Sequence, residues 1–461
     1  MNEHVKGGRL KRMARLATVT AKTARDVVAV RARQKISGVD EHAVADALKP
    51  TAARMVEVLG EMKGAATKLG QFISLADQET FPEEARKVLH KLLNQTPERM
   101  TAEQARAVFF GEFGQDPRDV FAQWDDEPLA SASMGQVHAA TLQNGREVVV
   151  KLQFPGVDRA IDSDVRNAVA MARGLAFGGG VLDVKRYVDE IAETLRRELD
   201  YREEVKQLRA YKTALEPWPD LVVPEPIDEW SSHRVVTLER LFGPTMLQAA
   251  EDPAYTDEQR YRIASQLVAA IWGPFLRCQL IHADPHPGNY IVLEDGRLGV
   301  LDFGATKNLT TPFTVAYWRI VTAAMRLEDI SIYDVLATVD FELGPPENAD
   351  KTRKWLQELA LIVERPIRNE FYDWGACQLA IDCRKHYMRD PTTAVRVRGP
   401  VESLMFYRAA VGASGDFRML RAKGNFRDVL RGVVKTAWET MDPELRKAAD
   451  AASVFIDDPS T

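Results

Sequence analysis

The stretch that most constrains this chain spans residues 280–304 and reads LIHADPHPGNYIVLEDGRLGVLDFG. Two short apolar runs, YIVL and LGVL, flank an Asp-Gly pair at 295–296. Because glycine accepts the positive φ that a tight turn needs, this pattern predicts a β-hairpin. The hairpin would bring Asn289, which precedes its first strand, close to Asp302, which follows its second strand.

An amide oxygen and a carboxylate held at the rim of a pocket suit Mg²⁺, a hard cation that prefers a few protein oxygens together with phosphate oxygens. Asn289 and Asp302 are therefore the predicted magnesium ligands. Asp284, five positions before Asn289, is then placed to orient or deprotonate an attacking hydroxyl or water. The order and spacing of these three residues are those of a kinase catalytic loop and its metal-binding Asp. His282 and His286 flank Asp284, but no third nitrogen or sulfur ligand lies nearby, so a transition-metal site is not favoured.

An earlier segment has the pattern of a phosphate-binding lobe. A loop of small residues leads into a strand, Asn-Gly at 144–145 marks a turn, and Glu147–Leu152 is the Val-rich return strand. A loop of this kind followed by a strand lysine is how a kinase covers nucleotide phosphates. The alternative for the lysine is a strand residue whose amine simply reaches solvent. The predicted nucleotide contacts here are Ala130, Ser131, Ala132, Ser133, Met134, Gly135, Gln136 and Lys151.

Helices and two further strands follow this segment. Residues 157–177 and 184–209 are predicted helices, separated by three glycines at 178–180. The second helix carries Glu198 and Asp200, candidates for one polar cluster, and Glu204 almost two turns after Glu198. A solvated acidic helix would look similar. Strands are predicted at 221–224 and 235–239, and Leu241–Gly243 would be the hinge to a helical second lobe. Glu239 and Leu241 at this hinge complete the predicted nucleotide contacts.

The N-terminal third is predicted to be helical after a basic leader. Apolar residues recur at helical spacing over 55–69, and Lys68 and Gln71 project from one side of that helix. Thr101 and Gln104 have the spacing of a capping box for a later helix.

Taken together, these motifs resemble the UbiB (AarF) family of atypical protein-kinase-like proteins. The resemblance covers roughly residues 50–310. It implies binding of ATP (or ADP) and Mg²⁺, with ATPase activity favoured over protein phosphorylation, and a link to isoprenoid-quinone or other membrane-lipid metabolism. It also implies an ion pair between Lys151 and Glu204, and a gate in which Lys68 and Gln71 face Glu198 and Asp200. The motifs that carry it are the K-x-G-Q at 68–71, the alanine-rich loop at 130–136, Lys151, the E-x-D at 198–200, the H-x-D-P-H-P-G-N at 282–289 and Asp302-Phe303-Gly304.

The resemblance implies an α+β, two-lobed protein-kinase-like fold with a helical N-terminal extension and a helical C-terminal segment. The expected domains are a basic leader at 1–37, a helical extension at 38–124, an N-lobe with a helical insert at 125–240 and a helical C-lobe at 241–461. Two departures from ordinary kinases stand out. Ala and Ser replace the glycines of the phosphate loop, which restricts its backbone. Position 283 is Ala, and no Ala-Pro-Glu follows the DFG, so control by loop phosphorylation is not expected.

Composition indicates a cytoplasmic protein. No apolar run reaches 18 residues, the stretch 263–280 reads as a buried helix, and three scattered cysteines suit a reducing compartment. The chain has net charge −6, yet residues 1–35 hold ten basic and two acidic side chains. Such a leader is expected to contact anionic membrane lipid peripherally, with no nucleic acid partner, although a solvated helical face is an open alternative. The sequence does not predict an oligomeric state.

Two other functions stay open from the sequence. Small-molecule phosphotransferases share the H-x-D, Asn and Asp layout but lack the K-x-G-Q helix. A nucleotide-binding scaffold without turnover is the second alternative. Against the scaffold stands the full set of Lys151, Glu204, Asp284, Asn289 and Asp302, because degenerate kinases usually lose at least one of these residues.

Overall fold

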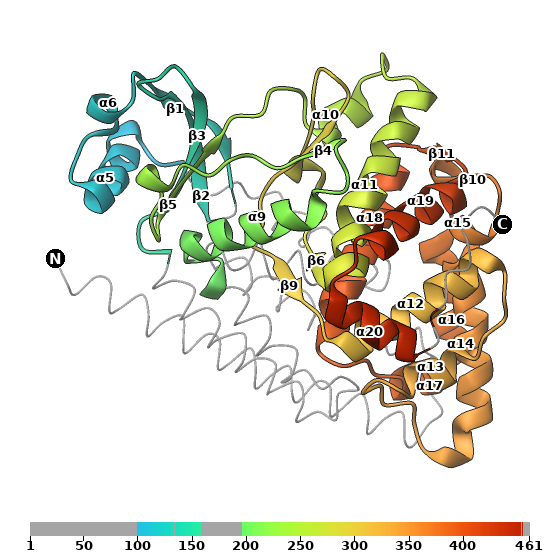
Figure 1. The fold of residues 1–461 in the computed structure, drawn as a ribbon. Coiled ribbons are helices and arrows are strands. Elements are labelled where there is room, and N and C mark those ends of the chain that lie inside the picture. The colour runs from blue at the N-terminus through green and yellow to red at the C-terminus, as the bar shows by residue number, and fades with distance from the viewer. Residues whose placement is uncertain (1–98, 133, 158–195, 453, 455–461) are drawn as a thin grey trace, which may run out of the picture. The chain divides into compact units, whose positions relative to one another are not determined.

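The computed structural model describes residues 99–132, 134–157, 196–452 and 454 (Figure 1). They form two compact units. The first holds the described residues up to Tyr201 together with Asp228–Thr237, and the second holds Arg202–Ile227 with the described residues from Leu238 onward. Helices and strands both contribute, which confirms the predicted α+β class. The predictions for several segments lie outside the described residues and stay predictions: the leader at 1–37, the extension up to 98 with Lys68 and Gln71, Ser133, most of the helix at 157–177, and the glycines at 178–180.

A four-stranded sheet forms the centre of the first unit. Strands β1 and β2 pair antiparallel, as do β2 and β3. The β2–β3 turn is closed by the amide of Leu142, which donates to the Arg146 carbonyl at 2.9 Å, and Gly145 has φ 82°. The predicted hairpin with its Asn-Gly turn is confirmed. The order is β1-β2-β3-β5, with β1 at Gln123–Ser131, β2 at Gly135–Thr141, β3 at Glu147–Gln153 and β5 at Val235–Glu239.

Two helices precede this sheet. α5 (Ala102–Phe113) begins with the predicted capping box, in which the Thr101 side chain accepts from the Gln104 amide, and α6 (Pro117–Val120) follows. Aromatic rings fill the space beside them: Phe109 is fully buried, 5.6 Å from Phe121 and 6.0 Å from Trp230 between ring centroids. β1 starts at Gln123, ahead of the alanine-rich loop at 130–136, where the sequence predicts no strand. Its side chains alternate between exposed and half-buried, so no apolar alternation marks it.

The prediction of one continuous helix over 184–209 is wrong at residues 198–200, and its part at 184–195 lies outside the described residues. Residues 198–200 form a turn, and α9 runs from Tyr201 to Leu215. Other parts of the first unit take the hydrogen bonds that a continuous helix would use. The Tyr201 amide donates to the His233 carbonyl at 3.0 Å, and the Gln153 side chain donates to the Leu199 carbonyl at 2.9 Å. Glu198 and Asp200 therefore lie in a turn, and they do not share a helix with Glu204.

The second unit contains a long buried helix followed by two small strand pairs. α11 (Asp257–Cys278) confirms the buried helix predicted at 263–280. Within the described residues, no helix combines the length and apolar character that a membrane crossing requires. After α11, β6 (Leu280–His282) pairs antiparallel with β9 (Thr306–Asn308), and β7 (Tyr290–Val292) pairs antiparallel with β8 (Leu298–Val300). β4 (Leu221–Val222) adds to β8 in parallel, and α10 (Met246–Glu251) precedes α11.

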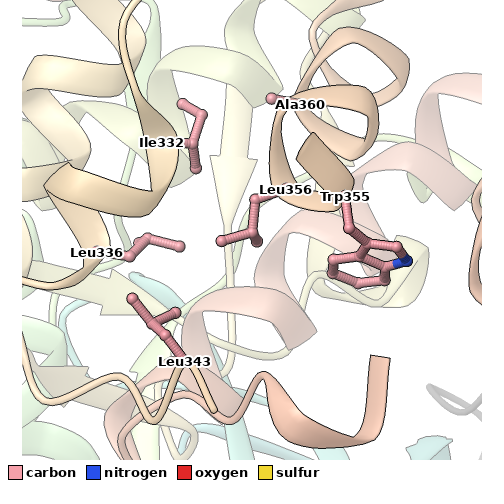
Figure 2. Close-up of a cluster of buried hydrophobic side chains, with 6 residues drawn as sticks. All are labelled: Ile332, Leu336, Leu343, Trp355, Leu356 and Ala360. Carbon is pink, nitrogen blue, oxygen red and sulfur yellow. The ribbon is translucent and has the colours of Figure 1, made fainter. Parts of the chain in front are cut away.

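From Thr311 on the described chain is mainly helical, as expected for the C-terminal segment. Figure 2 shows one of its cores, where Ile332, Leu336 and Leu343 lie near Trp355, Leu356 and Ala360 of the next long helix. A two-residue ladder, β10 (Tyr372–Asp373) with β11 (Lys423–Gly424), interrupts the helices. Strands this short leave no alternation to detect. The helices are α12 (Thr311–Arg326), α13 (Ile332–Leu336), α14 (Ala349–Val363), α15 (Arg365–Arg368), α16 (Leu379–Arg389), α17 (Pro391–Arg396), α18 (Glu402–Met419), α19 (Phe426–Glu439) and α20 (Pro443–Ala451).

Candidate functional site

The second unit brings the three predicted catalytic-loop residues together. The β6–β9 pair continues to the amide of Ala283, which donates to the Ala305 carbonyl at 3.1 Å, so Asp284 directly follows paired backbone. The side-chain nitrogen of Asn289 donates to the backbone carbonyl of Asp284 at 3.0 Å. At the base of the β7–β8 hairpin, the amide of Leu301 donates to the Asn289 carbonyl at 2.8 Å. The predicted hairpin is confirmed, and it joins Asp284, Asn289 and the residue before Asp302 through hydrogen bonds.

Asp302 is held in a conformation that non-glycine residues seldom adopt. Its φ is 55°, in the left-handed region, which costs roughly 1–3 kcal/mol and persists only where the surroundings fix it. Nε2 of His282 donates to the Asp302 carbonyl at 2.7 Å, and the Gly304 amide donates to Asp302 Oδ1 at 3.2 Å. The Phe303 ring is fully buried, 5.4 Å from Tyr211 and 5.8 Å from His282 between centroids. A buried aromatic anchor and an imidazole thus hold the Asp302 backbone.

His282 acts here as a neutral donor. It is almost completely buried, and burial lowers its pKa, against the opposing effect of its bond to the Asp302 carbonyl. His286 has a local role too, because its Nδ1 accepts from the Gly288 amide at 3.1 Å. Both imidazoles therefore have structural partners within the loop. Across the described residues, no cluster of three or more His, Cys, Asp or Glu side chains is arranged to hold a metal ion.

Helix α18 supplies a partner for Asp284 that no sequence motif indicates. Nη2 of Arg408 donates to Asp284 Oδ1 at 2.6 Å, and the two side chains are 3% and 14% exposed. One turn later on α18, a Cβ on Gly412 would lie 2.4 Å from Pro285 Cγ, so the helix backbone approaches the loop where only glycine fits. Arg408 and Gly412 fix the position of the Asp284-Pro285 pair.

Asp416 lies one turn after Gly412 on α18. Its side chain is buried, and its Oδ2 has no hydrogen-bond partner among the described residues. Burial, with a smaller contribution from the negative charge of Asp284, raises the pKa of Asp416 to about 8. Asp416 is therefore neutral in the folded protein below this pH, although an unfolded chain would ionise it near roughly 4.

Replacing Asp416 with Asn should remove a pH-dependent cost. As pH rises from about 4 to about 8, the unfolded wild-type chain loses the Asp416 proton and the folded protein keeps it, so stability falls by up to ~1.4 kcal/mol per pH unit. Above about 8 both states are ionised and the cost stays constant. We expect the free energy of unfolding of Asp416→Asn, relative to wild type, to rise between pH 4 and pH 8 in urea titrations. A difference that is the same at every pH would contradict this.

The predicted magnesium ligands have suitable chemistry. The Asn289 nitrogen is used by the Asp284 carbonyl, so the amide oxygen Oδ1 is the atom of that side chain suited to a cation. Asp302 adds a carboxylate at the other end of the same hairpin. Two protein oxygens, supplemented by phosphate oxygens and water, match the ligand set that Mg²⁺ uses in phosphoryl-transfer sites. The residues present therefore fit the ion.

The predicted hinge packs against this hairpin. Leu241 lies against Gly299 of β8, where an added Cβ would be 2.6 Å from Leu241 Cδ1. The Val292 amide donates to the Pro244 carbonyl at 2.9 Å, which ties the hinge to β7. Glu239, at the end of β5, accepts at Oε2 from the Glu225 amide at 3.2 Å. Leu241 thus lies beside the strand that leads to Asp302, and its role as a nucleotide contact stays a prediction.

The first unit holds the predicted phosphate loop. Ala130 and Ser131 end β1, the turn is closed by the Ala132 amide bonding the Gly135 carbonyl at 2.9 Å, and Gly135 and Gln136 begin β2. Gln136 is fully buried: its Oε1 accepts from the Met100 amide at 2.9 Å. In this arrangement Gln136 braces the strand. Met134 and Lys151 are also predicted nucleotide contacts. Met134 is buried, and Lys151 is half-buried in β3.

The remaining predicted residues lie on or before α9. Glu204 is 6% exposed on the first turn of the helix, and Glu198 is 9% exposed in the preceding turn with Asp200. Burial of Glu204 and Glu198 argues against the solvated acidic helix that the sequence left open. The ion pair of Glu204 with Lys151 and the gate formed with Lys68 and Gln71 stay predictions.

Comparison with known proteins gives consistent results. A model described as the ABC1 atypical kinase-like domain matches residues 91–336, more than half of the chain. The atypical kinase coq-8, mitochondrial, of Caenorhabditis elegans is 32% identical over 64% of this chain and 39% of its own length. The atypical kinase COQ8, mitochondrial, of Saccharomyces cerevisiae is 26% identical over 76% of this chain and 66% of its own. The chain thus spans less than two thirds of the length of both relatives.

A solved structure shares the fold as well. The complex of Rv3197 with erythromycin from Mycobacterium tuberculosis has a TM-score of 0.57 and 27% identity, covering 86% of this chain and 98% of that one. Together with the geometry of the catalytic loop, the family match confirms the predicted kinase-like fold. The chain belongs to the ABC1 atypical kinase-like (UbiB/AarF) family.

Proposed function

We propose that this protein binds ATP with Mg²⁺ and hydrolyses it or transfers its γ-phosphate, in support of isoprenoid-quinone or other membrane-lipid metabolism. The single observation that supports this most is the hydrogen-bonded frame of Asp284, Asn289 and Asp302. One hairpin and one buried strand anchor these three residues, which would serve as the catalytic Asp, the amide ligand and the carboxylate ligand.

Each residue has a role in this proposal. Asp284, oriented by Arg408 at Oδ1, would accept the proton of the attacking water or hydroxyl at Oδ2. Asn289 and Asp302 would hold Mg²⁺, which when bound neutralises phosphate charge. Lys151 would bind the α- and β-phosphates, and its pairing with Glu204 would fix the ammonium group. The neutral imidazole of His282 keeps Asp302 at its rare φ.

The family resemblance favours ATP hydrolysis over protein phosphorylation, and control by phosphorylation of the activation loop is not expected. Ala283 is completely buried beside Asp284, where an arginine would be needed to bind a phosphorylated loop, and no Ala-Pro-Glu follows Gly304. The two relatives from Caenorhabditis elegans and Saccharomyces cerevisiae are named as mitochondrial atypical kinases. The link of this chain to quinone or lipid metabolism rests on its family and on the basic leader.

The experiment that tests this function is ATP hydrolysis by the purified protein, with anionic and with neutral liposomes. We expect measurable Mg²⁺-dependent hydrolysis that increases with anionic liposomes at low salt and less so at high salt, because screening lengths near 10 Å at 0.1 M weaken the attraction of the leader. The absence of hydrolysis under all of these conditions would contradict the proposed turnover. A hydrolysis rate that does not depend on liposomes would support the ATPase activity and refute the link to membranes.

A small-molecule phosphotransferase is the second candidate. It would consume ATP only when an acceptor such as an amino alcohol is added, whereas an ATPase consumes ATP without one. Measuring ADP release with and without added acceptors distinguishes the two functions.

A further inference from the structure

The side chain of Tyr201 lies beneath the lysine that the proposed function assigns to the phosphates. Tyr201 is 1% exposed, and Nζ of Lys151 lies over its ring, 4.9 Å from the centroid. A cation within about 6 Å of an aromatic centroid is attracted to the face of the ring, most strongly where water is excluded. Both residues belong to the first unit, so the contact lies within one compact body.

Hydrogen bonds of the Tyr201 backbone and of Gln153 fix the position of the ring. Lys151 and Gln153 lie on the same face of β3, because side chains alternate along a strand. The Gln153 side chain donates to the Leu199 carbonyl at 2.9 Å, and the Gln153 amide donates to the Arg234 carbonyl at 3.0 Å. The Tyr201 amide donates to the His233 carbonyl at 3.0 Å. Strand β3 thus holds the turn before Tyr201 at the same face that carries Lys151.

The phosphate loop contains a glycine, Gly135, that packs against Tyr201. Gly135 is the cross-strand partner of Gln153. A Cβ on Gly135 would lie 2.8 Å from the Tyr201 hydroxyl oxygen and 2.3 Å from the Leu152 carbonyl oxygen. The glycine therefore leaves the space that Tyr201 occupies. Loop, lysine and ring form one packed arrangement.

We propose that Tyr201 is a positioning residue for Lys151. The aromatic ring of Tyr201 holds the Lys151 ammonium group where it can bind nucleotide phosphates. The proposal rests on the proposed nucleotide binding. The ring, and not the hydroxyl, attracts the ammonium group. Tyr201→Phe should therefore keep Lys151 in position, and an aliphatic substitution should not. The attraction depends on the charge of Lys151, so it disappears when that charge is removed.

A double-mutant cycle tests this. The Kd of Mg-ADP is measured for wild type, Tyr201→Phe, Tyr201→Leu, Lys151→Met and the Tyr201→Leu/Lys151→Met double variant, with thermal unfolding as the control for folding. We expect Tyr201→Phe to stay within about 2-fold of wild type and Tyr201→Leu to weaken binding by roughly 2- to 30-fold. In the Lys151→Met background, Tyr201→Leu should have no further effect. Equal weakening in both backgrounds, or equal weakening by Phe and Leu, would overturn the proposal.

A second measurement does not depend on nucleotide. Reductive ¹³C-methylation of the lysines gives one NMR resonance for Lys151, assigned by its absence in Lys151→Met. The ring should displace this resonance upfield in wild type and in Tyr201→Phe, and Tyr201→Leu should remove the displacement. An undisplaced resonance in wild type would overturn the proposal even if Mg-ADP binds. Failure of wild type to bind Mg-ADP would instead refute the proposed function.

Discussion

Asp302→Asn should reduce ATP turnover by at least roughly 100-fold. The substitution removes one negative charge from the predicted magnesium ligand and keeps the size of the side chain. A metal ion supplies several kcal/mol of charge stabilisation in phosphoryl transfer, and each ~1.4 kcal/mol is a factor of ten in rate. The Asp302 backbone should stay in place, because His282 binds the carbonyl and Phe303 is buried. The measurement is steady-state ADP release at saturating Mg²⁺ and ATP.

Asp295→Asn is the matched control. Asp295 lies on the same hairpin, at its turn, where its carboxylate binds Arg297 at 2.7 Å and is exposed. It loses the same charge at a site remote from Asn289 and Asp302 along the strands. Turnover of Asp295→Asn should remain close to wild type. A similar loss in both variants would mean that charge on the hairpin, and not a ligand at 302, matters.

Arg408→Met should destabilise the protein by about 3–5 kcal/mol and lower turnover by roughly 100-fold. The methionine fills much of the same volume but leaves the Asp284 carboxylate without its buried partner, and breaking a buried ion pair carries a cost of that size. Asp284 also loses the bond that fixes its Oδ1, and a misplacement of about 1 Å in a catalytic group can cost ~100-fold. Urea unfolding and ADP release measure the two effects.

The control is Arg431→Met on α19. Arg431 pairs with Asp428 at 2.8 Å, a similar separation, but the two side chains are 44% and 58% exposed. Exposed pairs contribute about 0–1 kcal/mol, so this variant should be close to wild type in stability and in turnover. Equal destabilisation by both substitutions would contradict the buried role of Arg408.

Local patterns in the sequence predict the parts of the site that lie close together along the chain. The hairpin between Asn289 and Asp302 follows from two short apolar runs and an Asp-Gly turn. The capping box at Thr101 and the buried helix α11 follow from side-chain spacing in the same way. In each case the residues that determine the structure are a few positions apart.

Contacts between distant segments leave no such pattern. Arg408 is 124 positions after Asp284, in a helix whose sequence carries no functional motif. The break before α9 depends on the Gln153 side chain, which donates to the Leu199 carbonyl, and on the His233 carbonyl, which accepts from the Tyr201 amide. These bonds compete with the helical hydrogen bonds that the local sequence would otherwise favour. The local sequence does not distinguish Asp416 from an exposed helical aspartate, because its burial depends on packing against other segments.

The measurement that tests the central claim most directly is nucleotide-induced thermal stabilisation, with and without Mg²⁺, of wild type and Asp302→Asn. A ligand that binds the folded state raises its stability, by about 2.7 kcal/mol at 100 times Kd. We expect ADP to stabilise wild type strongly only when Mg²⁺ is present, and Asp302→Asn to lose most of this Mg²⁺-dependent gain. Equal stabilisation of both proteins in the presence of Mg²⁺ would contradict it.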